Sequence, residues 1–245
     1  MKIENPEKRM AVASQIKEAK KRDTVGGSEH QWKNYRGYNS YESYLGGFSG
    51  MFEYIKTLPS HKVIDIGAGH TVAFGQLSRG AKDQGLTFEA VTLSGSLRRQ
   101  SYFKNDIKIH INSAENMRSI SSNEYGGVIS VYSICYSEAP DVVVDNIDRI
   151  LVPGGVFKGS FAPDEKGLDV PGAKTPHLFN EYFIKKGYDT AINEGVLLAI
   201  KPGPNICTAT ELMKKDTDNE EKKKAAKQAA SELADKRWAK RKRNR

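Results

Sequence analysis

Long hydrophobic runs and paired cysteines are missing from this 245-residue sequence. No stretch of about 18 apolar residues occurs, so the sequence predicts no membrane-spanning helix. Residues 1–22 lack the apolar core of a secretory signal peptide, and we expect no classical secretion. The only two cysteines, Cys135 and Cys207, fit no metal-ligand spacing and no disulfide framework. They predict reduced thiols in a cytoplasmic protein without a metal site.

An excess of one charge is also missing from most of the chain. Residues 1–213 carry 25 Lys and Arg against 24 Asp and Glu, whereas residues 214–245 carry 13 against 6. Any attraction to a polyanion therefore has to come from the C-terminal segment.

The final ten residues, KRWAKRKRNR at 236–245, are basic at seven positions. Such a segment favours nucleic acid or an acidic protein as a partner, or a nuclear import signal if the cell is eukaryotic. A solvated tail with no specific partner is the alternative. We expect removal of residues 214–245 to leave ligand binding by the rest of the chain intact.

Short apolar segments alternate with segments of helical periodicity from residue 62 onward. Strands are predicted at 62–66, 87–93, 107–111, 127–132, 156–161, 188–193 and 196–200, and helices at 71–85, 96–104, 140–150 and 176–186. This alternation predicts a three-layer, Rossmann-like α/β sandwich with a seven-stranded, mostly parallel sheet. Glu194-Gly195 joins the last two strands and predicts an antiparallel terminal hairpin.

The same patterns divide the chain into three segments. We predict an N-terminal helical and aromatic cap at 1–58, the Rossmann-like domain at 59–203, and a basic helical or disordered tail at 204–245. Within the cap, aromatic residues recur about every three positions: Trp32, Tyr35, Tyr38, Tyr41, Tyr44 and Phe48. They fit either a helix with an aromatic face or a flap over a ligand, and the interspersed glycines argue against one long helix.

The segment VIDIGAGH, residues 63–70, combines a buried strand with a glycine turn. Ligands of such sheets bind beyond the carboxyl ends of the strands, where Asp65, Gly67 and Gly69 lie. A dinucleotide site needs a third glycine at the position of Val72, and a phosphate-binding P-loop needs a Gly-Lys-Ser/Thr ending; neither is present. Asp65 instead suits a cationic ligand group. An ordinary turn in which Asp65 caps the next helix is the alternative.

Four blocks in order resemble the class I S-adenosylmethionine-dependent methyltransferases, in particular the type 11-like members. VIDIGAGH is similar to their motif I, and the segments after the third strand, through the fourth strand and before the fifth strand are similar to the later motifs. These later blocks are SAENM at 113–117, VISVYSICY at 128–136 and RILVPGG at 149–155. The resemblance covers about residues 30–201 and implies S-adenosylmethionine as cofactor.

The resemblance also implies which residues border the cofactor. Those at the methionine part are Asp65, Gly67 and Gly69, those beside the adenine are Ala114 and Glu115, and Val131 to Ser133 lie near the transferable methyl group. Thr92 stands where the family has an acidic residue for the ribose hydroxyls. Ser113 stands where the family often has an Asp that accepts a hydrogen bond from the adenine amino group.

No strong catalytic motif accompanies these blocks, and methyl transfer needs none beyond correct positioning of the reactants. Candidates for orienting or deprotonating an acceptor are Tyr132, Tyr136, Glu138 and His177. The sequence predicts a methyltransferase with an unidentified acceptor. The alternative is a methyltransferase-like binding protein with weak or no activity, which engages nucleic acid or a protein through its basic tail.

Overall fold

The computed structural model describes residues 44–68, 82–92, 108–161, 174–204 and 207–243, with side chains as far as Glu232 in the last range. Most of the aromatic segment at 26–50, most of the helix predicted at 71–85 and all of that at 96–104 lie outside these residues. The described helices are α4 (Ser49–Ile55), the short 3-10 helix η3 (Ile134–Tyr136), α6 (Pro140–Ile150), α7 (Pro176–Lys185) and α8 (Ala209–Arg243).

A seven-stranded sheet runs through the centre of the molecule in the order β3-β2-β1-β4-β5-β7-β6. Its strands are β1 (Lys62–Ile66), β2 (Thr87–Thr92), β3 (Lys108–Ile111), β4 (Tyr125–Val131), β5 (Leu151–Ser160), β6 (Asp189–Asn193) and β7 (Val196–Ile200). The first five pair in parallel, while β7 pairs antiparallel with β5 and β6. The predicted fold, including the terminal hairpin, is confirmed.

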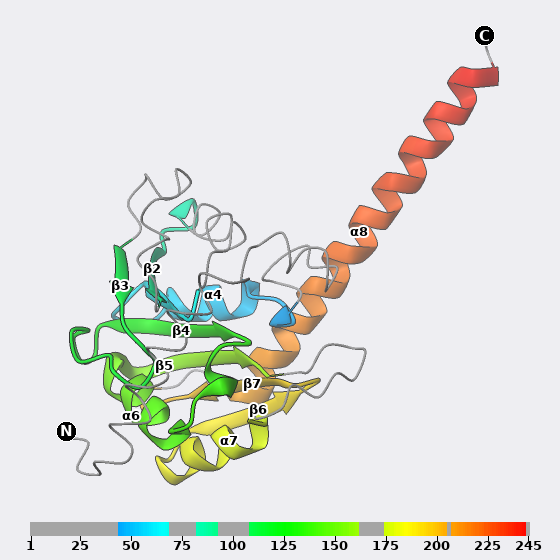
Figure 1. The fold of residues 1–245 in the computed structure, drawn as a ribbon. Coiled ribbons are helices and arrows are strands. Elements are labelled where there is room, and N and C mark those ends of the chain that lie inside the picture. The colour runs from blue at the N-terminus through cyan, green and yellow to red at the C-terminus, as the bar shows by residue number, and fades with distance from the viewer. Residues whose placement is uncertain (1–43, 69–81, 93–107, 162–173, 205–206, 244–245) are drawn as a thin grey trace.

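Helices cover both faces of the sheet and make the three layers (Figure 1). One buried cluster joins α4 and the start of α8 to side chains such as Val63, Ala90 and Ile129. The other joins α6 and α7 to side chains such as Ile64 and Val128. Because neighbours along a strand point to opposite faces, these near-continuous apolar strands are buried on both sides.

The fifth strand starts earlier than its apolar run suggests. The sequence predicts a turn at residues 152–155, but β5 begins at Leu151, which pairs with Tyr125. The register then shifts between Tyr125 and Gly127, and Gly154 has a φ of 77°. An irregular strand therefore continues through residues with strong turn propensity.

The C-terminal helix is part of the core at its beginning. Ala209, Leu212 and Met213 are buried in the α4 cluster, and Asp216 is fully buried. The Asp216 carboxylate pairs with the Lys158 amine of β5 at 2.7 Å. It also accepts the backbone N–H groups of Gly50 and Met51, at 2.6 and 3.1 Å, where α4 begins.

This anchor limits which residues form a separable tail. Deleting residues 214–245 removes Asp216 and leaves the Lys158 ammonium buried without its carboxylate, which is a costly arrangement. A deletion that tests the basic segment alone has to begin beyond the buried turn of α8. The division of the chain at 58 and 203 stays a prediction.

Candidate functional site

The first strand ends in a buried acid and a turn that requires glycine. Asp65 is fully buried, and Gly67 has a φ of 79°, a conformation that L side chains rarely adopt. The N–H groups of Gly67 and Ala68 donate to the carbonyl of Val91, at 2.8 and 3.2 Å. The turn therefore stays attached to the end of β2 as it leaves the sheet. Gly69 lies outside the described residues.

The turn after β1 packs against the end of β4. A Cβ atom on Gly67 would overlap the side chain of Ser133, so only glycine allows this approach. The hydroxyl of Ser130 donates to the carbonyl of Ile66 at 3.0 Å and ties the same two strands together. Val131, the last residue of β4, thus lies beside the strand that carries Asp65 and Gly67.

Two buried hydroxyl groups lie at the carboxyl ends of β2 and β3. Thr92 is 5% exposed, and its carbonyl accepts the N–H of Asn112 at 2.9 Å. Ser113 follows β3 and is 6% exposed, and its Oγ has no hydrogen-bond partner in the described part of the chain. A buried polar atom without a partner costs free energy in the protein alone, which makes it a candidate ligand-binding atom.

The turn after β3 is tied to the turn after β4. Glu115 is 6% exposed, and its Oε1 accepts the hydroxyl of Ser137 at 2.6 Å. Ser137 Oγ in turn accepts the N–H of Ala139 at 3.1 Å, just before α6. The carbonyl of Ala114 accepts the Asn146 amide at 3.0 Å. Sequence reasoning missed Ser137 and Asn146, because spacing along the chain gives no sign of contacts between separate turns.

Tyr132 is the buried member of the predicted catalytic set. It is 8% exposed and has a φ of 49°, unusual for a non-glycine residue. Its N–H donates to the carbonyl of Ser160 at the end of β5, 3.1 Å away, and its ring meets that of Tyr44 edge-on at 5.0 Å. A strained conformation held by a hydrogen bond and a ring contact is typical of functional positions.

The remaining candidates lie on the surface. Tyr136, in η3, is 41% exposed, and Glu138 and His177 are exposed as well. His177 belongs to the first turn of α7, whereas Tyr136 and Glu138 precede α6. A role for these three in the chemistry stays a prediction.

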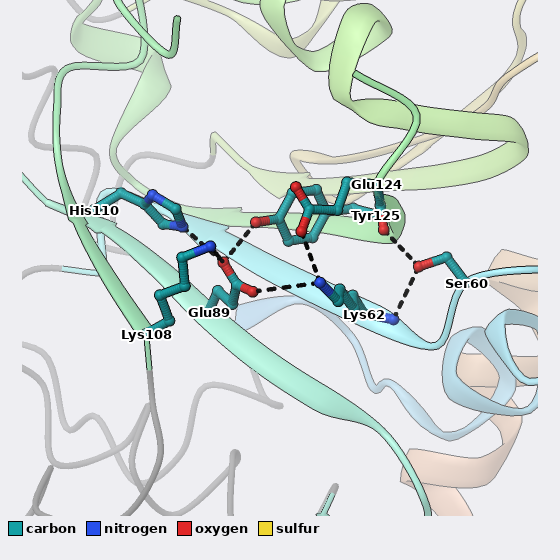
Figure 2. Close-up of polar contacts among 7 residues, drawn as sticks. All are labelled: Ser60, Lys62, Glu89, Lys108, His110, Glu124 and Tyr125. Atoms are coloured by element: carbon teal, nitrogen blue, oxygen red, sulfur yellow. Dashed lines mark hydrogen bonds and ion pairs between the residues drawn. The ribbon is translucent and has the colours of Figure 1, made fainter. Parts of the chain in front are cut away.

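A second polar cluster, shown in Figure 2, centres on the buried carboxylate of Glu89. Its Oε2 accepts the hydroxyl of Tyr125 and lies 2.6 Å from His110 Nε2, and Lys108 lies at 3.6 Å. Lys62 bridges Glu89 and Glu124, at 3.9 and 2.6 Å.

This cluster fits a structural role. Burial, followed by the adjacent Glu89, raises the pKa of Tyr125, so the phenol stays protonated and donates. The Lys62 amine lowers the pKa of Glu124, and the hydrogen bond to Glu124 raises the pKa of Lys62. These contacts join the first four strands away from their carboxyl ends.

Neither metal binding nor membrane spanning finds support among the described residues. They contain no group of three His, Cys, Asp or Glu residues placed to hold a metal ion. Within the same part of the chain, no helix has both the length and the apolar character needed to cross a membrane.

The chain's similarity to known proteins bears directly on the carboxyl edge of β1–β4. Residues 64–158 match the family model described as "Methyltransferase domain". This part of the chain is therefore similar to methyltransferase domains. The matched residues begin in β1 and end in β5, and they include every described residue of the carboxyl edge from Asp65 to Tyr136. No curated protein matches the chain.

Solved structures that are similar to the chain have low sequence identity to it. The CurJ carbon methyltransferase is 11% identical, with a TM-score of 0.50, and the match covers 62% of this chain and 52% of that one. A putative S-adenosylmethionine-dependent methyltransferase of Methanococcus maripaludis is 18% identical over 78% and 95% of the two chains, with a TM-score of 0.49. The [4+2]-cyclase SpnF is 13% identical over 62% and 78%, with a TM-score of 0.49. The match to CurJ spans about half of that protein.

Proposed function

We propose that this protein is an S-adenosylmethionine-dependent methyltransferase whose cofactor lies along the carboxyl ends of β3, β2, β1 and β4. The observation that carries the proposal is the pair of buried polar groups at this edge, the Asp65 carboxylate and the Ser113 hydroxyl, which has no hydrogen-bond partner among the described residues. Asp65 is on β1 and Ser113 follows β3, with β2 between them. At about 4.8 Å per strand, the two are separated by roughly 10 Å across the sheet, and Ser113 also lies four residues beyond Ile109, which is level with Asp65. This separation suits an extended ligand with a different group at each end.

The residues at this edge match the chemistry of the cofactor from one end to the other. Asp65 suits the ammonium group of the methionine part, and the turn at Gly67 and Gly69 brings backbone close to it. Thr92 would hydrogen-bond a ribose hydroxyl. These groups favour a cationic amino-acid ligand over a pyrophosphate, which the Asp65 carboxylate repels.

At the adenine end, the Ser113 hydroxyl would accept a hydrogen bond from the amino group, a partner that it lacks among the described residues. Ala114 and Glu115 border the ring, and the hydrogen bond from Ser137 keeps Glu115 in place. Val131 lines the floor near the methyl group. The cofactor, when bound, supplies an electrophilic methyl group on a sulfonium.

The chain's own contribution to transfer is mainly positioning, because the displacement needs the acceptor in line with the methyl carbon. Tyr132 is placed to orient the acceptor, since its strained backbone and the Tyr44 contact hold its ring at the end of β4. Tyr136, Glu138 and His177 remain candidates for taking up the acceptor's proton. Cys135 and Cys207 form no disulfide in the described part of the chain, which favours a cytoplasmic location for this reaction.

The direct test is the shift in melting temperature caused by S-adenosylmethionine, with NADH as the comparison ligand. At a ligand concentration 100 times its Kd, binding stabilises the folded state by about 2.7 kcal/mol, or roughly 5–10 °C for a chain of this size. We expect this shift with S-adenosylmethionine only. An equal shift with NADH, or none with either ligand, would overturn the proposal.

Ser113→Ala separates ligand binding from folding. Because Ser113 Oγ has no partner in the described part of the chain, its removal should leave the melting temperature unchanged or slightly raised. Affinity for S-adenosylmethionine should fall about 3- to 10-fold, the value of one hydrogen bond. The matched control is Ser160→Ala, on β5, which removes another buried hydroxyl that has no partner among the described residues, and it should leave the affinity unchanged.

A further inference from the structure

The outer part of α8 extends away from the rest of the protein. Residues 221–232 are all exposed, whereas four residues of the first two turns, Ala209 to Asp216, are buried. Figure 1 shows the helix leaving the body on the side toward which the arrows of β4 and β5 point. At 1.5 Å per residue, the helix from residue 221 to residue 243 is about 35 Å long. We call residues 221–243 the arm.

The arm holds nearly all of the chain's charge excess. It contains ten Lys and Arg against three Asp and Glu, while residues 1–213 are nearly neutral. Six of the ten lie within residues 236–243, a stretch without an acidic residue. A local excess of this size attracts polyanions, and the strength of that attraction depends strongly on salt concentration.

The arm is held in a fixed direction by its root. The Asp216 carboxylate pairs with Lys158 at 2.7 Å, with both side chains fully buried. The N–H of Ala209 donates to Asp189 Oδ2 at 2.7 Å, where the helix begins. These contacts join α8 to β5 and β6, so the basic positions are presented at a defined place relative to the sheet.

The distribution of charge around the helix selects the partner. Apart from alanine, the arm has only Leu233 and Trp238 as apolar residues, at positions about 140° apart around the axis. A helix needs a continuous apolar face to lie in a membrane surface or in a protein groove. Successive residues are about 100° apart, so five of the six basic positions at 236–243, all but Lys242, lie within about 160° around the axis. A basic face of this width can contact the phosphates on both sides of a duplex groove, which admits an α-helix.

We propose that the arm binds the phosphate backbone of a nucleic-acid duplex, without sequence preference. This proposal does not depend on methyl transfer. It does place a bound duplex on the side of the molecule where β4 and β5 end, which is the side of the candidate site (Figure 1).

Salt dependence gives the expected signature of this contact. If all six basic residues at 236–243 neutralise phosphates, the logarithm of the binding constant should fall with the logarithm of salt concentration with a slope of about −5. Backbone recognition also predicts similar affinities for duplexes of unrelated sequence. DNA and RNA duplexes differ in groove shape, so comparing them shows which backbone geometry the arm prefers.

The test measures fluorescence anisotropy of labelled 20-base-pair DNA and RNA duplexes with the full chain, without S-adenosylmethionine. The arm variant is Lys236→Gln, Lys240→Gln, Lys242→Gln, and the control variant is Lys56→Gln, Lys82→Gln, Lys185→Gln. Both lose three positive charges by the same substitution. The arm variant should lose about three units of salt slope, with at least a tenfold weaker affinity, and the control should behave like wild type.

Three results would overturn the proposal. One is absence of binding to either duplex at 20 mM salt, and another is an equal loss of affinity in both variants, which would reflect net charge alone. The third is binding of polyglutamate as tightly as duplex, which would indicate an acidic protein as the partner. Unchanged melting temperatures exclude misfolding of either variant. Because no cofactor is present, failure here leaves the methyltransferase proposal untouched.

Discussion

At the scale of single residues, Gly67 is the position in the candidate site where both the backbone conformation and the space available require glycine. Its φ of 79° and its contact with Ser133 both exclude a larger residue. We expect Gly67→Ala to destabilise the fold by about 1–3 kcal/mol and to abolish the thermal response to S-adenosylmethionine, because the turn has to move. Denaturant unfolding and ligand-dependent melting measure the two effects.

Gly85→Ala is the matched control for that substitution. Gly85 has the same φ of 79°, but a Cβ atom there would meet nothing within 4 Å. It should carry only the cost of backbone strain and keep the full response to S-adenosylmethionine. If both variants respond alike, Gly67 has no special place in the binding site.

The thiol of Cys207 provides a pH-dependent test of the loop before α8. Burial, followed by the nearby Glu211 carboxylate, raises the pKa of this thiol above its ordinary value. Because only the thiolate reacts, alkylation of Cys207 should reach half its maximal rate at a higher pH in the folded protein than in urea. Peptide mass spectrometry separates Cys207 from the buried Cys135. A midpoint equal to or below that of the unfolded chain would contradict this environment.

A sequence predicts the position of a residue best when a local backbone pattern, such as a strand followed by a glycine turn, requires that residue type. Asp65 and Gly67 follow a buried strand in a fixed pattern, so their place at the carboxyl end of β1 was predictable. The hydrogen bond between Ser137 and Glu115 joins residues 22 positions apart, on turns that meet only in the folded sheet. Nothing in the spacing of either segment predicts it.

At the scale of elements, the root of α8 depends on one buried ion pair. In Asp216→Asn the amide oxygen can still accept the N–H groups of Gly50 and Met51, but the Lys158 ammonium loses its opposite charge. We expect a loss of about 3–5 kcal/mol in the free energy of unfolding, as for breaking other buried ion pairs. Urea unfolding followed by circular dichroism measures it.

Asp218→Asn, two residues further along the same helix, is the control. Asp218 is exposed, so its substitution should change stability by no more than about 0.5 kcal/mol. Equal effects of the two substitutions would show that the pair does not anchor α8.

The terminal hairpin could be predicted because local sequence determines its turn, whereas the start of the C-terminal helix depends on a tertiary contact. Glu194 and Gly195 have φ values of 47° and 76°, as expected for the tight turn that their sequence predicts. Helix α8 begins at Ala209, well before the Ala- and Lys-rich part of the tail, whose composition favours a helix. Its first turns are helical because Leu212 and Met213 pack on the sheet, which is a tertiary contact.

At the scale of the whole molecule, the boundary between body and arm lies within α8. Deleting residues 221–245 removes exposed positions as far as Glu232 and should leave both the melting temperature and the response to S-adenosylmethionine close to wild type. Deleting residues 214–245 also removes Asp216 and should lower the melting temperature clearly. Equal stability of the two truncated chains would show that α8 is not part of the core.

The two ends of the sheet differ in how fully their buried polar groups are satisfied. Around Glu89, the tyrosine, histidine and lysine partners occupy the carboxylate oxygens (Figure 2). At the carboxyl ends, Ser113 is buried without a partner among the described residues. From this contrast we infer that the Glu89 cluster stabilises the fold, whereas the carboxyl ends of the strands bind a ligand.

The most direct measurement is a calorimetric titration of S-adenosylmethionine into the wild-type protein and into Asp65→Asn. We predict one binding site in the wild type, with an affinity at least tenfold weaker in the variant, because a charge-assisted hydrogen bond is worth about 1.5–3 kcal/mol. The melting temperature of the variant without ligand checks that it folds. No heat from the wild type at high micromolar concentration, or equal affinity in both proteins, would contradict a cofactor site at the carboxyl end of β1.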